Sequence, residues 1–219
     1  MSPLRCENIC CRRAPAHKVR EAHIDSFTAT FESGDITGFC GSDTAGKELL
    51  LAILGMIEQP DSGSLSVWDQ VVPDANDPLH ARIRDTSFGY LFTHPHLLPS
   101  FTVAENVAMP FLRICGQDDV REHTLAALEF AGIADLQGIQ VSELPEAAHW
   151  RVAFARAIVH SPPLLVAISP PHASLLPLAR RLADELGTAV LWNGDQSDAL
   201  PFLDHFVEMN PALPQNRVP

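Results

Sequence analysis

The stretch that decides the fold is GSDTAGKE, residues 41–48. It follows a short apolar segment at 35–39 and opens a proline-free apolar segment at 46–57, so the pattern predicts a strand, a tight loop and a buried helix. In such a loop glycines let N–H groups turn inward, the helix N-terminus adds positive potential, and a lysine reaches the phosphates. The sequence therefore predicts a phosphate-binding loop (P-loop), whose residues are Gly41, Ser42, Asp43, Thr44, Ala45, Gly46, Lys47 and Glu48.

Two acidic residues of this loop oppose that chemistry. The position after the lysine, which needs a Ser or Thr hydroxyl for Mg²⁺, is Glu48, and Asp43 adds a second carboxylate. A carboxylate within ~4–6 Å of a phosphate oxygen opposes binding unless a metal lies between them. Lys47 is then expected either to form an ion pair with one of these acids or to keep contact with a phosphate. In a further alternative Glu48 itself ligates Mg²⁺, although its length would crowd the β-phosphate.

Composition excludes several classes of protein. The 219 residues include 15 basic and 27 acidic side chains, for a net charge of −12, so we expect no nucleic-acid partner. No apolar run reaches the ~18 residues of a membrane helix, and the N-terminus lacks the apolar stretch of a secretory signal. These features predict a cytoplasmic protein. Its five cysteines are expected to be reduced, and no metal site is predicted, because Cys6, Cys10 and Cys11 have no second Cys/His pair at finger spacing.

The order of elements predicts one α/β domain over residues 1–219. Alternating polarity at 4–10 and 23–31 predicts antiparallel strands, and the wholly apolar segment at 164–168 is typical of a buried parallel strand. Helical patterns follow at 120–131, 149–159 and 178–186, and further strands at 35–39, 64–67, 87–92, 189–192 and 205–209. We expect a core α/β lobe (1–94 and 160–210), an inserted helical subdomain (95–159) and an irregular tail (211–219).

Beyond the loop, the chain resembles the ATP-binding subunits of ATP-binding-cassette (ABC) transporters, over about residues 4–209. It is most similar to the class that serves lipoprotein-release, macrolide-export and cell-division permeases. The segments that carry the resemblance are 31–39, 55–63, 88–107 and 151–158. The resemblance implies a P-loop ABC-type nucleotide-binding domain with a mixed or parallel sheet core, an N-terminal antiparallel β-subdomain and an inserted helical subdomain. It also implies head-to-tail pairing of two subunits and a permease coupling helix held near residues 93–109.

The same resemblance shows which functional positions have changed. The family's Q-loop glutamine falls on Thr93, its Mg²⁺-binding Asp and catalytic Glu on Ile168 and Ser169, and its switch histidine on Gly194. Ile168 cannot ligate a metal, and Ser169 is not a general base at neutral pH. Nothing in the spacing positions the nearby His172 or Asp195 as a substitute. The signature motif falls on Leu144, Pro145, Glu146, Ala147 and Ala148.

At the signature positions the chemical properties of the side chains have changed as well as the residue types. Pro145 has neither the hydroxyl nor the N–H that the motif offers to a γ-phosphate, and Glu146 brings a carboxylate to the helix N-terminus. Because each nucleotide site in the family combines one subunit's P-loop with the other's signature, even a dimer with an intact paralogue would lack a complete site.

Three functions follow from these observations. The favoured one is a pseudo-ATPase: a structural or regulatory subunit of a membrane ABC permease complex, paired with itself or with an ABC ATPase paralogue. It would lie on the cytoplasmic face of the inner or plasma membrane. The alternatives are a divergent but active ATPase that powers transport or mechanotransmission, and a soluble binding module with a reused cleft. For the pseudo-ATPase no cofactor is predicted. ATP and Mg²⁺ would bind only if the P-loop can still bind nucleotide.

Overall fold

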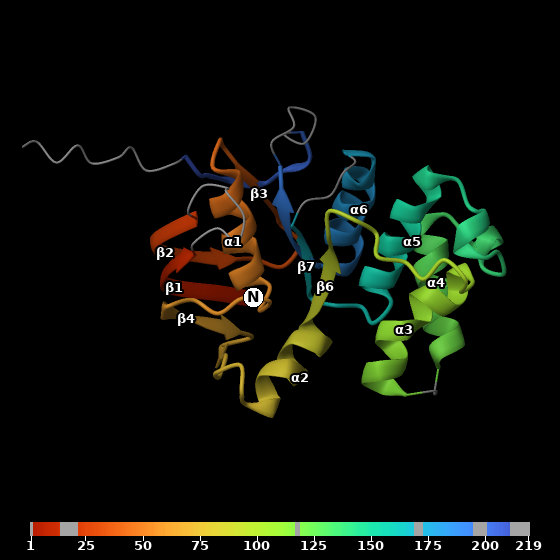
Figure 1. The fold of residues 1–219 in the computed structure, drawn as a ribbon, viewed down its shortest axis with the longest axis horizontal. Coiled ribbons are helices and arrows are strands. Elements are labelled where there is room, and N and C mark those ends of the chain that lie inside the picture. Colours follow the sequence, from red (N-terminus) through yellow and green to blue (C-terminus); the bar gives the residue numbers. More distant parts are fainter. Residues whose placement is uncertain (1, 14–21, 117–118, 169–172, 195–200, 211–219) are drawn as a thin grey trace, which may run out of the picture.

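The computed structural model describes residues 2–13, 22–116, 119–168, 173–194 and 201–210. Two sheets with helices between and beside them form an α/β cassette (Figure 1). The antiparallel sheet has the order β2-β1-β4-β5, and the second sheet, in which every pair is parallel, has the order β6-β7-β8-β3-β9. The chain thus has the predicted antiparallel N-terminal sheet and parallel core.

The antiparallel sheet buries one face through a two-residue alternation. In β1 (Leu4–Arg13) the side chains of Leu4, Cys6, Ile9 and Cys11 are buried, and the register shifts between Cys6 and Ile9 where the alternation slips by one. The other strands of this sheet are β2 (Ala22–Phe31), β4 (Ser62–Val67) and β5 (Gln70–Val71).

The parallel sheet is covered on both faces, which is why its strands are continuously apolar. In β7, Leu164 and Val166 pack into the core that holds α1, whereas Leu165 and Ala167 pack into the core that holds α5 and α6. The strands are β3 (Ile36–Cys40), β6 (Phe88–Leu91), β7 (Leu164–Ala167), β8 (Ala189–Asn193) and β9 (His205–Glu208).

The helices occupy three layers. Helix α1 (Thr44–Leu54) lies between the two sheets, α6 (Leu176–Leu186) covers the opposite face of the parallel sheet, and three helices pack on one another beyond it (Figure 1). That three-helix group is α3 (Val103–Cys115), α4 (Val120–Ala131) and α5 (Glu146–Ile158). The remaining elements are α2 (Pro78–Ser87) and the 3₁₀ turns Ala134–Leu136, Val141–Glu143 and Ala173–Leu175.

Several boundaries differ from the sequence predictions for identifiable reasons. The helix predicted at 46–57 begins at Thr44, because Asp43 caps it, and ends at Leu54, because the chain turns at Gly55 and at Met56 with φ of 57°. The helix predicted at 149–159 begins at Glu146, since the φ of −64° at Pro145 suits a helix start. The strand predicted at 87–92 begins at Phe88, because residue 87 still belongs to α2.

Within the residues that the structure describes, no helix is both long and apolar enough to cross a membrane.

Candidate functional site

The parallel sheet brings the sequence-predicted positions to one edge. Pairing of Leu91 with Ala167, of Ala167 with Trp192 and of Phe39 with Asn193 aligns the carboxyl ends of β6, β7, β8 and β3. The P-loop and Thr93, Ile168 and Gly194 follow directly after these ends. Ligands of open α/β sheets bind outside this edge, so the structure brings these predicted residues together. Ser169, His172 and Asp195 lie outside the described part of the chain.

The P-loop hydrogen-bonds to itself and to the segment that follows β9. The Asp43 carboxylate is the N-cap of α1, where Oδ1 accepts from the Gly46 N–H at 2.9 Å. The Asp43 N–H donates to the Met209 carbonyl at 3.1 Å, and the Ser42 N–H donates to Asn210 Oδ1 at 3.4 Å. Sequence reasoning did not predict the contacts to Met209 and Asn210.

The lysine of the loop is enclosed. Lys47 is 0% exposed, and its Nζ donates to the Gly41 carbonyl at 2.7 Å. Gly41 needs its φ of +105°, because it turns the chain out of β3 against the backbone of Met209. Glu48, one residue beyond the lysine, is exposed.

The other positions at the edge are held by backbone contacts. The Ile168 N–H donates to the Leu91 carbonyl at 2.9 Å, the Ile168 carbonyl accepts from Asn193 Nδ2 at 2.6 Å, and the side chain packs against the core. The Gly194 N–H donates to the Phe39 carbonyl at 3.0 Å, and the Gly194 carbonyl accepts from the Cys40 thiol at 3.2 Å. Thr93 is exposed. Among the described residues of this edge, Ile168 thus presents an alkyl side chain, and the backbone groups of Ile168 and Gly194 are paired within the chain.

The signature-equivalent residues belong to the start of α5. Pro145 is the N-cap and makes no side-chain cap hydrogen bond, and its carbonyl accepts from the Ala148 N–H at 2.9 Å. Glu146 and Ala147 are exposed, and Leu144 is half-buried. Pro145 therefore starts the helix without offering a donor there.

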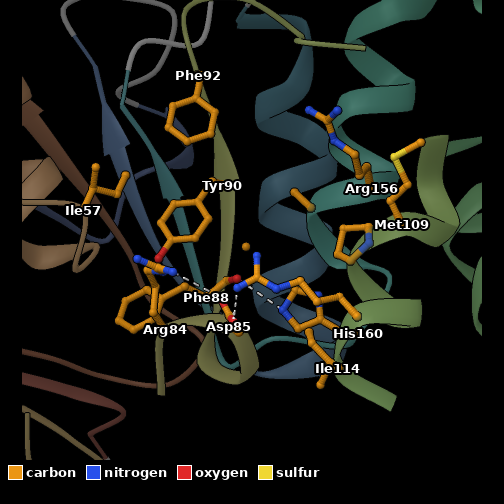
Figure 2. Close-up of a pocket in the computed structure, with 14 residues that line it drawn as sticks. Ile57, Arg84, Asp85, Phe88, Tyr90, Phe92, Met109, Ile114, Arg156 and His160 are labelled. Carbon is orange, nitrogen blue, oxygen red and sulfur yellow. Dashed lines mark hydrogen bonds and ion pairs between the residues drawn. The ribbon is translucent and has the colours of Figure 1, made fainter. Parts of the chain in front are cut away.

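A second site that sequence reasoning did not predict is a groove of about 550 Å³ between β6 and the helices α3 and α5 (Figure 2). One wall is an aromatic ladder on β6 and just after it, with ring centroids 6.0 Å apart for Phe88 and Tyr90 and 5.8 Å apart for Tyr90 and Phe92. The opposite wall includes Met109 and Ile114. The alternation in FGYLF, residues 88–92, was the signal that could have predicted the ladder.

The groove also holds charged groups. Arg84 and Arg113 both pair with Asp85. Arg156 donates to the carbonyls of Pro95 at 2.5 Å and His96 at 2.7 Å, and burial lowers its pKa. Three guanidinium groups thus line the groove with one carboxylate, on a chain of net charge −12.

His160 lies at the same groove with one ring nitrogen paired. Its Nε2 lies 3.2 Å from the Phe88 carbonyl, while the buried Nδ1 has no hydrogen-bond partner in the described structure. Burial lowers the pKa of this imidazole. Nowhere in the described residues do three His, Cys, Asp or Glu side chains come together as a metal-ligand set.

Comparison with known proteins gives one consistent result. The family model described as "ABC transporter" matches residues 24–168. The chain is 32% identical over 163 residues to the Macrolide export ATP-binding/permease protein MacB of Burkholderia pseudomallei (strain 1710b), covering 74% of this chain and 25% of that protein. It is 31% identical over 174 residues to the Lipoprotein-releasing system ATP-binding protein LolD of Bordetella avium (strain 197N), covering 76% of each.

Solved structures share the fold at lower sequence identity. The dimeric structure of MJ0796, a bacterial ABC transporter cassette, aligns with a TM-score of 0.80 and 20% identity over 94% of both chains. The structure of cbiO1 from Clostridium perfringens aligns with a TM-score of 0.79 and 20% identity, over 95% of this chain and 84% of that one. The chain therefore spans nearly the whole of these cassettes but only about a quarter of the macrolide export protein.

Proposed function

The chain belongs to the ABC transporter family, as an ATP-binding-subunit homologue, and we propose that it serves its permease complex as a pseudo-ATPase. In this proposal the cassette binds and orders a membrane permease without hydrolysing ATP. It lies on the cytoplasmic face of the membrane and pairs with a copy of itself or with a related cassette. The names of its relatives, an ATP-binding/permease protein and the ATP-binding protein of a releasing system, support the link to a permease.

One observation carries the loss of catalysis. At the carboxyl end of β7, where the family has its Mg²⁺-binding acid, stands Ile168, whose half-buried side chain packs against the core and whose carbonyl accepts from Asn193 Nδ2. Phosphoryl transfer depends almost entirely on positioned charge: a metal, its ligands and a group that orients the nucleophile. An alkyl side chain supplies none of these. The residues present therefore do not fit ATP·Mg²⁺, and no hydrolytic step is assigned to them.

The groove supports the docking part of the proposal. Its aromatic ladder and its arginines offer an apolar surface and positive charge, which suit an amphipathic segment of a partner. It includes Met109 and lies beside Pro95 and His96, within the segment 93–109 near which the family resemblance places the coupling helix of the permease. We place the permease contact in this groove.

The proposal is tested by turnover and by membrane association. The full chain, expressed with a candidate ABC permease from the same genome, should co-purify with that permease and show no ATP turnover above that of a Lys47→Ala variant. Met109→Asp puts a charge on the groove wall and should release the permease. Leu125→Asp changes a 41% exposed leucine on α4 that is not part of the groove, and it should not.

Two results would contradict this function. Turnover that Lys47→Ala abolishes would show a divergent but active ATPase, the alternative that the retained lysine favours. Equal co-purification of both aspartate variants would show that the permease, if it binds, binds elsewhere.

A further inference from the structure

We infer that the Asp43 carboxylate occupies the phosphate position of the P-loop and is the residue that excludes phosphate groups from it. This deepens the proposed function and rests on it, because it supplies the reason that the cassette would work without nucleotide.

The hydrogen bonds of the loop carry the first step. A P-loop binds phosphate through backbone N–H groups that point at the ligand. Here the N–H groups of Ser42, Asp43 and Gly46 donate to Asn210 Oδ1, the Met209 carbonyl and Asp43 Oδ1. The N–H groups of Thr44 and Lys47 donate to the carbonyls of Ser42 and Asp43, at 3.1 and 3.0 Å. A phosphate would have to replace acceptors that these groups already have.

The position of the carboxylate carries the second step. Oδ1 lies 2.9 Å from the Gly46 nitrogen, and a Cβ placed on Gly46 would lie only 2.7 Å from Asp43 Cγ, so the carboxylate rests directly over the first turn of α1. It therefore puts a negative charge where the helix dipole and the N–H groups favour an anion. The side chain stands in for the oxygens of a phosphate, and like charge disfavours a second anion beside it.

The backbone around Asp43 keeps the carboxylate in place. Its N–H is held by the Met209 carbonyl, and its own carbonyl accepts from the Lys47 N–H. The lysine that would meet a phosphate instead donates to the Gly41 carbonyl at 2.7 Å. The loop is thus satisfied from within the chain, by one side chain and by the segment after β9.

The experiment measures phosphate binding without chemistry. Isothermal titration with inorganic tripolyphosphate, at low salt and without Mg²⁺, compares the unmodified full chain with Asp43→Ser. Serine keeps an N-cap acceptor while removing the charge, so the fold should be retained and tripolyphosphate should bind at least about tenfold more tightly. Asp43→Asn, which keeps the shape of the side chain, is the second variant if the serine variant does not fold.

A matched control separates the effect of removing a carboxylate from the P-loop from the effect of removing one negative charge elsewhere. Asp77 is the N-cap of α2 and accepts from the Leu79 N–H at 2.8 Å, so Asp77→Ser removes the same charge from the same kind of helix start. Only the Asp43 variants should gain affinity. The inference would be overturned if neither Asp43 variant bound tripolyphosphate more tightly than the unmodified chain. It would also be overturned if Asp77→Ser gained as much affinity as the Asp43 variants. These results leave the absence of turnover and the permease contact to their own tests, so the two proposals fail separately.

Discussion

The carboxyl edge of the parallel sheet and the groove beside β6 differ in what they do with their polar groups. At the edge, five N–H groups of the P-loop, the carbonyl of Ile168 and that of Gly194 bond within the chain. In the groove, a space of about 550 Å³ remains between an aromatic wall and a set of arginines. One region is closed by its own hydrogen bonds, and the other presents surface that a partner can cover.

Under the proposed function, this difference would let a cassette lose its chemistry and keep a docking surface. Hydrolysis needs several charged groups at one point, and in the proposal Ile168 takes the place of one metal ligand. Docking needs apolar area and a few charges, at about 25 cal/mol for each Å² of apolar surface buried. The groove is built mainly from β6, α3 and α5, and its lining residues differ from those at the edge, which meets it through the hydrogen bond from the Ile168 N–H to the Leu91 carbonyl of β6.

The largest expected effect tests how firmly the edge is closed. Gly41→Ala places a Cβ at φ of +105° and against the Met209 carbonyl, so we expect the free energy of unfolding to fall by about 3 kcal/mol or more. Gly116→Ala, at φ of +78° with no heavy atom nearby, should cost only about 1 kcal/mol. Urea unfolding of both variants measures the difference; equal costs would show that the segment after β9 does not press on the loop.

A smaller loss of unfolding free energy is expected for a substitution in α3, the helix on one side of the groove. Asn106 is 0% exposed, and its side chain accepts from the Leu98 N–H at 2.7 Å and donates to the carbonyls of Leu98 and Thr102, both at 3.0 Å. Asn106→Ala leaves the Leu98 N–H without this acceptor and takes one donor from each of the two carbonyls, which keep a backbone N–H donor, and the change should cost about 2–3 kcal/mol.

The same substitution should affect one region and spare the other. Hydrogen exchange of Asn106→Ala should speed up around residue 98 and stay unchanged in the P-loop. Faster exchange both around residue 98 and in the P-loop would show that the stability of the edge depends on that of the groove.

Much of the fold could be predicted because its signals are local. The P-loop, the buried strand at 164–168 and the helix at 120–131 each carry their pattern within one element, and α4 begins and ends at the predicted residues. Helix α3 was expected only as part of a helical region, because Pro110 inside it interrupts the pattern. Helix α2 was missed although Asp77 and Pro78 form a recognisable start.

The sites were less accessible from sequence because they join distant segments. The hydrogen bond from Ser42 to Asn210 spans 168 positions, and no local pattern indicates it. The groove likewise combines Tyr90 of β6, Met109 of α3 and His160 from the turn after α5. The positions at the sheet edge could be predicted because a parallel sheet places the ends of its strands together. The roles of those positions, like the predicted limits of the helical subdomain, stay predictions.

The next prediction separates the charge of Arg156 in the groove from the geometry of its hydrogen bonds. Arg156 ties the loop at 95–96 to α5 through two carbonyls, and burial lowers the pKa of its guanidinium. Arg156→Lys keeps the charge but cannot donate to both carbonyls in the same way, so we expect a loss of about 1–2 kcal/mol in unfolding free energy. Arg121→Lys, an exposed position on α4, should change it by less than about 0.5 kcal/mol. Equal unfolding free energies for the two lysine variants would show that the two hydrogen bonds of Arg156 do not stabilise the groove.

The smallest effect is a pH dependence that belongs to the groove. Because Nε2 of His160 faces the Phe88 carbonyl, it carries the proton of the neutral ring, and Nδ1 is a buried acceptor. Burial lowers the pKa of His160 below its usual 6.5, against the opposing attraction of Asp85. A histidine with a lowered pKa stabilises the fold above pH 6.5, and this contribution is lost as the pH falls towards the folded-state pKa.

His160→Gln should therefore flatten the fall in stability between pH 7 and about pH 5.5, a range in which carboxylates stay ionised. Glutamine can still donate to the Phe88 carbonyl, so the fold at pH 7 should be retained. The exposed His94, changed to Gln, serves as the control and should leave the slope as it is. Thermal unfolding across this range checks the expectation. An unchanged slope in His160→Gln would show that Nδ1 gains an acceptor when it is protonated; Asp85, whose charge raises the pKa of this imidazole, lines the same groove.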